Sequence, residues 1–124
     1  MNTNWTILLM LLAAVAIVFM VRKSGRISAS QAVEQLKQGA LVIDVRTPGE
    51  FNAGHLPRAI NIPLDEIETV LPARVKDKNQ VLLLHCASGM RSGVARSQLK
   101  RLGYANAFNL GSYSRAESLL RRAN

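Results

Sequence analysis

The sequence predicts an α/β domain with a mostly parallel central sheet and helices on both faces, preceded by one transmembrane helix. Two continuous apolar runs, residues 41–45 and 81–85, are typical of strands that are covered on both faces. Helical patterns with apolar residues on one side separate and follow these runs. A third apolar run, residues 5–21, precedes every charged residue of the chain.

The composition limits the classes of protein to consider. A length of 124 residues favours one compact domain, and 48% hydrophobic against 19% charged residues excludes a largely disordered chain. The single cysteine excludes a disulfide framework and a multi-thiolate zinc site, so no metal is expected. The net charge of +8 suggests nucleic acid, but aromatic residues make up only 5% and no block of five basic residues occurs. We therefore expect no nucleic-acid partner.

Residues 5–21 read WTILLMLLAAVAIVFMV, with Thr6 as the only polar side chain. At 1.5 Å per residue the run covers roughly 25 Å, near the lower limit for crossing a bilayer. Its apolar side chains favour insertion, and Trp5 suits the membrane interface. We predict a transmembrane anchor and a basic juxtamembrane linker over residues 1–27, with the membrane as a partner through residues 5–21.

A cleaved signal peptide is the competing interpretation of this segment. Signal peptides carry basic residues before the apolar core, whereas here Arg22, Lys23 and Arg26 follow it. The small residues at 14–16 resemble a cleavage site, but cleavage there would leave an exposed apolar tail, so retention is favoured. The positive-inside rule then predicts a single-pass protein with its N-terminus outside and its domain in the cytoplasm. A single reduced cysteine fits that compartment.

Residues 28–124 are predicted to form the domain. Ser28 or Ser30 can cap a first helix that stops at Gly39, and the strand over 41–45 follows. Pro63 opens a short helix before the strand over 81–85.

The remaining elements are a helix over about 92–102, a strand over about 107–110 and a helix from about Ser112. In parallel sheets ligands bind at the carboxyl ends of the strands. Asp44 with Arg46, and His85 with Cys86, stand at two such ends. We therefore expect these residues to be neighbours.

The segment CASGMRS, residues 86–92, lies between an apolar strand and an amphipathic helix. Backbone N–H groups and the helix N-terminus there favour a thiolate, so Cys86 is a candidate nucleophile. Gly89 permits a tight loop, Arg91 offers a forked donor to an oxyanion, and Ser92 can cap the helix or bond the sulfur. The alternative interpretation is an inert buried thiol.

Two motifs together make the chain resemble the rhodanese-like sulfurtransferases. CASGMRS matches the Cys-x-x-Gly-x-Arg-Ser loop of that family, and residues 44–63, DVRTPGEFNAGHLPRAINIP, match its upstream block. The likeness covers roughly residues 28–111. It implies a rhodanese-like fold in a single-domain sulfurtransferase. Arg58 departs from the pattern, because glycine is usual there, and Gly111-Ser112 replaces the usual Gly-Gly.

The resemblance also implies a reaction. Cys86 would take the outer sulfur of thiosulfate or a similar donor as a persulfide and pass it to cyanide or to a thiol, including a protein thiol. No cofactor is implied. Asp44 and Arg46 would support the loop. The substrate-binding positions implied are Ala87, Ser88, Gly89, Met90, Arg91 and Ser92.

Two other functions remain open from the sequence. One is a membrane-tethered persulfide carrier or interaction module with weak catalysis, which the same loop would serve. The other is a cysteine phosphatase or arsenate reductase. The anion-binding loop of those enzymes has five residues between Cys and Arg, whereas four residues separate Cys86 from Arg91.

Three further side chains are interpreted as structural. His85 adjoins Cys86, but consecutive strand residues point to opposite faces, so it is expected behind the site rather than as its base. His55 is expected to hold a turn, and Glu50 to form an ion pair. The basic C-terminal third is a solvated face, an attractant for sulfur oxyanions or a surface for anionic lipid.

Overall fold

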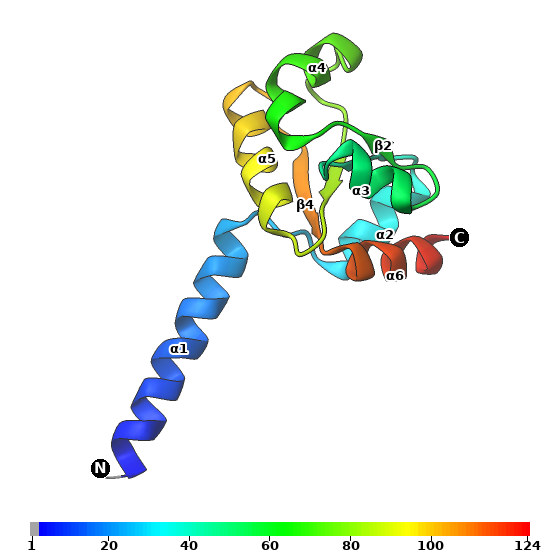
Figure 1. The fold of residues 1–124 in the computed structure, drawn as a ribbon. Helices are drawn as coiled ribbons and strands as arrows, with labels where there is room; N and C mark the ends of the chain where they lie inside the picture. Colours follow the sequence, from blue (N-terminus) through cyan, green and yellow to red (C-terminus); the bar gives the residue numbers. More distant parts are fainter. Residues whose placement is uncertain (1–2) are drawn as a thin grey trace.

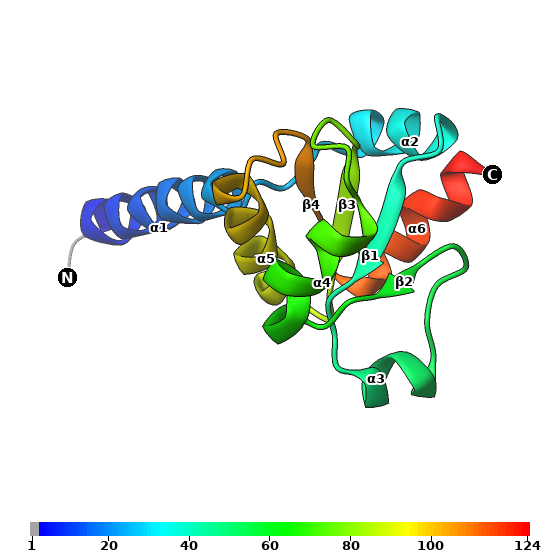
Figure 2. The ribbon, with the colours of Figure 1, turned by 90° about the horizontal axis from the view of Figure 1, so that it is seen from above.

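The computed structural model describes the backbone of residues 3–124 and the side chains of residues 4–20 and 24–124. Its centre is a parallel sheet with the strand order β2-β1-β3-β4. Figure 2 shows helices on either side of this sheet, which confirms the predicted α/β architecture. The strands are β1 (Leu41–Asp44), β2 (Ile60–Asn61), β3 (Leu82–His85) and β4 (Ala107–Gly111).

The two faces of the sheet bury separate cores because side chains alternate along each strand. Ile43 and Leu84 pack on the face covered by α4 (Ile67–Arg74) and α5 (Met90–Arg101). Val42 and Leu83 pack on the face covered by α2 (Ala29–Lys37) and α6 (Tyr113–Ala123). All four side chains are at most 1% exposed. Burial on both faces explains why β1 and β3 are continuous apolar runs.

Some elements differ from those predicted by the sequence. Ser28 caps α2 as expected, with its hydroxyl accepting from the Gln31 amide. Helix α5 begins at Met90, two residues before the predicted start. The short helix predicted after Pro63 begins with a turn of 3-10 helix, η1 (Leu64–Glu66), and continues as α4. A short helix α3 (Pro48–Ala53) was not predicted. The capping box at the start of α3, TPGE, is the signal that could have found it.

Helix α1 (Thr3–Lys23) extends away from the domain (Figure 1), and each of its described side chains is exposed. The transmembrane helix predicted over residues 5–21 is not supported, because the described part of the chain contains no helix long and apolar enough to cross a membrane. At 1.5 Å per residue, residues 5–20 cover about 24 Å, less than the ~30 Å of a hydrocarbon core. The side chains of Arg22 and Lys23 lie outside the described residues.

The segment after α1 pairs with β4 at the edge of the sheet. The backbone amide of Asn109 donates to the Gly25 carbonyl at 2.9 Å, and the backbone amide of Ile27 donates to the backbone carbonyl of Asn109 at 3.0 Å. Ile27 is buried in the core beneath α2 and α6. This pairing places the base of α1 beside β4.

Arg58, which stands where glycine is usual in the family, has a positive φ of 71°. A side chain in this left-handed region is strained. Its guanidinium donates to the carbonyls of Leu36 and Ala40 at 3.1 and 3.0 Å. These bonds tie the Arg58 turn to the last turn of α2 and to the residue before β1, and so offset the backbone strain.

Candidate active site

The cysteine loop, residues 86–92, joins the end of β3 to the start of α5. Gly89 has a φ of 95°, and a Cβ on it would lie 3.3 Å from the carbonyl carbon of Gly111. Both its backbone conformation and its close contact with β4 therefore require glycine. This turn directs the loop amides back toward the residue that follows the strand.

The Cys86 thiol lies at the centre of this loop and is fully buried. The Gly89 amide donates to its Sγ at 3.0 Å, and the Ser92 hydroxyl lies 3.5 Å from it. Burial raises the pKa of Cys86, but the Ser92 hydroxyl and the amides of Ser92, Gly89 and Ser88 lower it by more, so the pKa falls below that of an ordinary thiol. The site therefore favours the nucleophilic thiolate.

The remaining residues of the loop are held by the backbone of the β4–α6 junction. The Tyr113 amide donates to the Ala87 carbonyl at 3.2 Å, and Ser88 forms an isolated bridge with Ser112. Met90 is 78% exposed at the first turn of α5. Of the predicted substrate-binding residues, Ser88, Gly89 and Ser92 thus lie at the sulfur, whereas Met90 is an exposed apolar group.

Asn109, on β4, holds the loop from behind and was not among the predicted site residues. It is 2% exposed, and its Nδ2 donates to the Gly89 carbonyl at 2.9 Å. Its Oδ1 accepts from the Gly111 amide at 2.9 Å and from the Ser92 hydroxyl at 2.7 Å. No local sequence signal reveals this role, because the loop and β4 meet only through the sheet.

The two backbone partners of Asn109 fix the orientation of its amide. Its Oδ1 therefore faces Ser92, whose single hydroxyl proton is directed to that oxygen. In this arrangement Ser92 offers the Cys86 sulfur a lone pair. The hydroxyl can lower the pKa of Cys86 only by turning its proton from Asn109 to the thiolate.

Arg91 does not face the centre of the loop as an unpaired cation. Its two terminal nitrogens donate to the two carboxylate oxygens of Glu50 on α3 at 2.7 and 3.0 Å. Arg91, with the Thr47 amide, lowers the pKa of Glu50 to about 2. Because both side chains are 36% exposed, the Arg91 guanidinium is open to solvent, where an incoming anion can compete with Glu50 for it.

Asp44 and Arg46 lie beneath the loop rather than in it. Arg46 donates to both carboxylate oxygens of Asp44 at 2.7–3.0 Å and to the Gly54 carbonyl at 2.8 Å. This buried pair connects β1 to the segment after α3. Neither side chain forms a hydrogen bond with the Cys86 sulfur among the residues described.

His85 connects that buried pair to the loop through the backbone. Its Nδ1 lies 3.2 Å from the Cys86 carbonyl, which can only accept, so Nδ1 carries the proton. Its Nε2 has no hydrogen-bond partner in the described part of the chain and lies 3.8 Å from Asp44. Burial lowers the pKa of His85, which keeps the ring neutral. The ring supports the loop and is not positioned as a base for the sulfur.

Comparisons with known proteins agree with this geometry. The family model described as Rhodanese-like domain matches residues 28–117. The thiosulfate sulfurtransferase PspE of Escherichia coli (strain K12) is 39% identical over 69 residues, which cover 56% of this chain and 66% of that protein. The thiosulfate:glutathione sulfurtransferase of Saccharomyces cerevisiae is 34% identical over 77 residues, 53% of this chain and 55% of that protein.

Solved structures give the same result. A human single-domain sulfurtransferase, TSTD1, has a TM-score of 0.64 at 27% identity, covering 76% of this chain and 96% of its own. The E. coli rhodanese solved with anions has a TM-score of 0.60 at 35% identity, covering 62% and 91%. With the family model matched over nearly the whole domain and the cysteine loop formed as its motif requires, the chain belongs to the family of rhodanese-like domain sulfurtransferases.

Proposed function

We propose that the protein transfers sulfane sulfur from thiosulfate or a similar anionic donor to cyanide or a thiol through a persulfide on Cys86. The observation that carries the proposal is the buried Cys86 sulfur, which accepts from the Gly89 amide at 3.0 Å in a loop that lowers its pKa. The E. coli relative, a thiosulfate sulfurtransferase, and the yeast relative, a thiosulfate:glutathione sulfurtransferase, support thiosulfate as donor and a thiol as acceptor.

In the first half-reaction, the Cys86 thiolate attacks the outer sulfur of thiosulfate. A new S–S bond forms to Sγ, the S–S bond of thiosulfate breaks, and sulfite leaves with the electron pair. The loop amides that favour the thiolate can then stabilise the charge on the outer persulfide sulfur. Arg91 can exchange Glu50 for the oxyanion of the donor.

In the second half-reaction, the acceptor attacks the outer sulfur of the persulfide. A new bond forms between the acceptor and the outer sulfur, and the Sγ–S bond breaks with its electron pair returning to Cys86. The product is thiocyanate when the acceptor is cyanide and a persulfide when the acceptor is a thiolate. The starting thiolate is regenerated without a cofactor or an external oxidant.

A Cys86→Ser variant tests this proposal. Thiosulfate should add one sulfur to the native protein, detected by mass spectrometry and removed by cyanide, and should add none to Cys86→Ser. Circular dichroism establishes that the variant is folded. Thiocyanate formation by the folded variant would refute the proposal, and aryl-phosphate hydrolysis by the native protein at a comparable rate would favour the phosphatase class.

We also propose that α1 attaches the domain to a membrane, with the domain on the cytoplasmic side. Most of its described side chains are apolar, and all of them are exposed. Basic residues follow it in the sequence. Attachment requires these side chains to enter lipid. Resistance of the bound protein to alkaline carbonate extraction is expected, and release into the carbonate supernatant would contradict the proposal.

A further inference from the structure

Residues 24–26 hold the base of α1 against α5 and β4. A Cβ on Gly93 of α5 would lie 3.5 Å from the Ser24 Cβ, so the two segments pack closely. The Arg96 side chain crosses Gly25 at the place where a Cβ would stand. Backbone hydrogen bonds to β4 complete the junction. These contacts fix the direction of α1, so one particular face of the domain lies beside it.

A cavity of about 610 Å³ lies at this junction. Its lining includes Met20 of α1, Arg26, and Met90 and Val94 of α5. The volume falls within the ~300–1,000 Å³ that is typical of small-molecule sites. Cys86 is not part of the lining. The cavity is therefore separate from the site of sulfur transfer.

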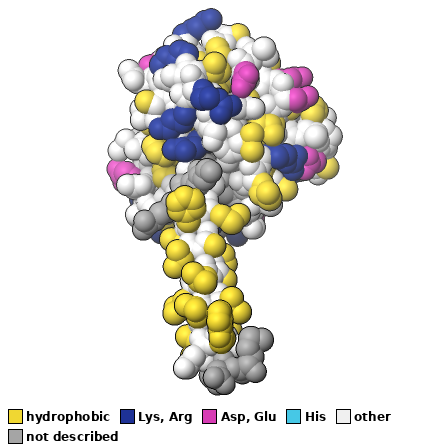
Figure 3. All heavy atoms as spheres, turned by 90° about the vertical axis from the view of Figure 1, so that its left-hand side faces the viewer, with side chains coloured by type: hydrophobic (Ala, Val, Ile, Leu, Met, Phe, Trp, Pro, Cys, Tyr) yellow, Lys and Arg dark blue, Asp and Glu magenta, His cyan; other side chains and the backbone are white. Residues whose placement is uncertain are grey.

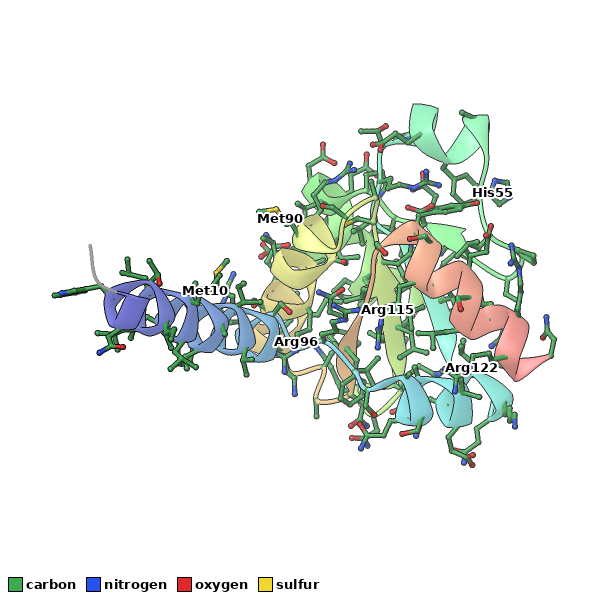
Figure 4. All side chains as sticks on the ribbon, turned by 90° about the horizontal axis from the view of Figure 1, so that it is seen from below. Met10, His55, Met90, Arg96, Arg115 and Arg122 are labelled. Atoms are coloured by element: carbon green, nitrogen blue, oxygen red, sulfur yellow. The ribbon has the colours of Figure 1, made fainter. Side chains whose placement is uncertain are left out.

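Apolar surface extends from α1 across the cavity to α5. Outside α1, the large hydrophobic side chains that are exposed among the described residues are Met90, Val94 and Leu102. Met90 and Val94 are four residues apart on α5, so they lie on one face of that helix, and both line the cavity together with Met20. Figure 4 shows Met90 on the side of the domain from which α1 leaves. Exposed apolar side chains gathered in this way mark a contact surface.

The same junction carries positive charge. Arg26 is exposed, and no ion pair or side-chain hydrogen bond engages it within the described residues. Burial and the nearby charge of Arg26 lower the pKa of Arg115, so a second guanidinium adds to the positive potential here. Figure 3 shows further Lys and Arg side chains on the domain above the base of α1. An anionic group is therefore attracted to this edge of the cavity.

From this arrangement we propose that the cavity binds the headgroup of an anionic phospholipid, in the membrane to which α1 attaches the domain. The inference rests on that proposed attachment and adds the surface that faces the lipid. Met20 lies at the domain end of α1, so with the apolar side chains of α1 in lipid the cavity lies at the level of the headgroups. The phosphate pairs with Arg26, and the glycerol and upper acyl carbons pack against Met90 and Val94.

Oxidation of methionines in the unmodified full chain tests the inference. The chain is placed in nanodiscs of phosphatidylcholine, alone or with phosphatidylglycerol, and treated with a water-soluble oxidant that converts accessible methionine to its sulfoxide. Met10 of α1 and Met90 of α5, both labelled in Figure 4, are 73% and 78% exposed, so only contact with lipid distinguishes them. Peptide mapping by mass spectrometry gives the oxidation rate of each.

Met10 should be oxidised slowly in both kinds of disc, because hydrocarbon surrounds it. Met90 should be oxidised several-fold more slowly in discs with phosphatidylglycerol than in discs of phosphatidylcholine alone, because anionic headgroups draw the α5 face onto the bilayer. Inorganic phosphate added to discs of phosphatidylcholine should leave the rate at Met90 unchanged. Protection of Met90 by phosphate would assign the cavity to a free anion and overturn the lipid assignment.

Arg26→Ala should raise about fivefold the fraction of phosphatidylglycerol that half-protects Met90, which corresponds to ~1 kcal/mol for one basic residue at an anionic surface. Arg26→Lys should keep most of the native protection. Arg122→Ala is the matched control, because Arg122 is an exposed arginine near the end of α6 and its loss removes the same charge. Its half-protecting fraction should equal the native value.

The outcomes separate this inference from the attachment on which it rests. Equal rates at Met90 in the two kinds of disc, with Met10 protected, would overturn headgroup binding and leave the attachment of α1 intact. Equal shifts in Arg26→Ala and Arg122→Ala would also overturn it, because the effect would then be one of net charge. Rapid oxidation of Met10 in every disc would refute the attachment, and this inference with it.

Discussion

The hydrogen bonds of Asn109 set the chemistry of the cysteine loop at the scale of single residues. Asn109→Asp keeps an acceptor for Ser92 and for the Gly111 amide but loses the donor to the Gly89 carbonyl. The new carboxylate would hold the Ser92 proton more strongly and add negative charge near the sulfur. Both effects should raise the pKa of Cys86.

The rate of alkylation of Cys86 by iodoacetamide, followed against pH, measures this change. Asn106→Asp is the matched control, since Asn106 is a half-buried asparagine before β4 whose side-chain amide donates to the Asn79 carbonyl and takes no part in the hydrogen bonds of the cysteine loop. The same profile in both variants would show that Asn109 does not influence the thiol.

His85 is expected to give the domain a pH-dependent stability. Burial lowers the pKa of His85 in the folded protein, so below the ordinary imidazole value of about 6.5 the unfolded chain binds a proton that the folded chain excludes. The free energy of unfolding should therefore fall as the pH drops below that value, until the folded pKa is reached. Urea unfolding at a series of pH values measures it.

His85→Gln should lose this component of the pH dependence, whereas His55→Gln should retain it, because His55 is exposed. Parallel pH profiles for the native protein and His85→Gln would contradict the prediction.

At the scale of elements, the cap of α3 connects local helix stability to the rim of the site. The Thr47 hydroxyl accepts from the Glu50 amide, and the Glu50 carboxylate accepts from the Thr47 amide while it also binds Arg91. Thr47→Ala should cost about 1 kcal/mol of stability. It should also lower the KM for thiosulfate, because Glu50, which competes with the donor for Arg91, is no longer held in place.

Ser28→Ala removes the comparable cap of α2, which is not connected to Arg91. A similar loss of stability with an unchanged KM is expected for this control. Equal changes of KM in the two variants would show that the cap of α3 has no specific effect on donor binding.

At the scale of the whole molecule, the domain and α1 should be energetically separate. The described side chains of α1 are exposed, whereas Ile27 is 5% exposed and its backbone pairs with β4. A chain that starts at residue 24 should therefore unfold at the same temperature as the full protein.

A chain that starts at residue 28 should lose about 2 kcal/mol or more, from the burial of one isoleucine and the edge hydrogen bonds. Thermal unfolding followed by circular dichroism compares the three chains. Equal stability of the chains starting at 24 and 28 would show that the edge segment contributes nothing.

The sequence by itself determined the α/β class, the order of the long elements and the position of the nucleophile. These features depend on local patterns: apolar runs for β1 and β3, amphipathic spacing for the helices, and a glycine and a helix start next to Cys86. The Ser28 cap was predictable for the same reason, because it depends on residues three positions apart. The short helix α3 contains too few apolar residues to show an amphipathic pattern, although the sequence of its capping box is present.

Only the tertiary structure decided which distant groups meet at the site. Asn109 is 17 residues from its partner Ser92, and Glu50 is 41 residues from its partner Arg91. No local sequence pattern specifies such pairs. The parallel sheet brings β4 beside the loop, and α3 brings Glu50 to a guanidinium that the sequence assigned to the substrate. The same holds for Arg58, whose positive φ is offset by bonds to the carbonyls of Leu36 and Ala40, which only folding places within reach. Hydrogen-bond partners depend on distance in space, and in this domain the pairing of parallel strands sets those distances.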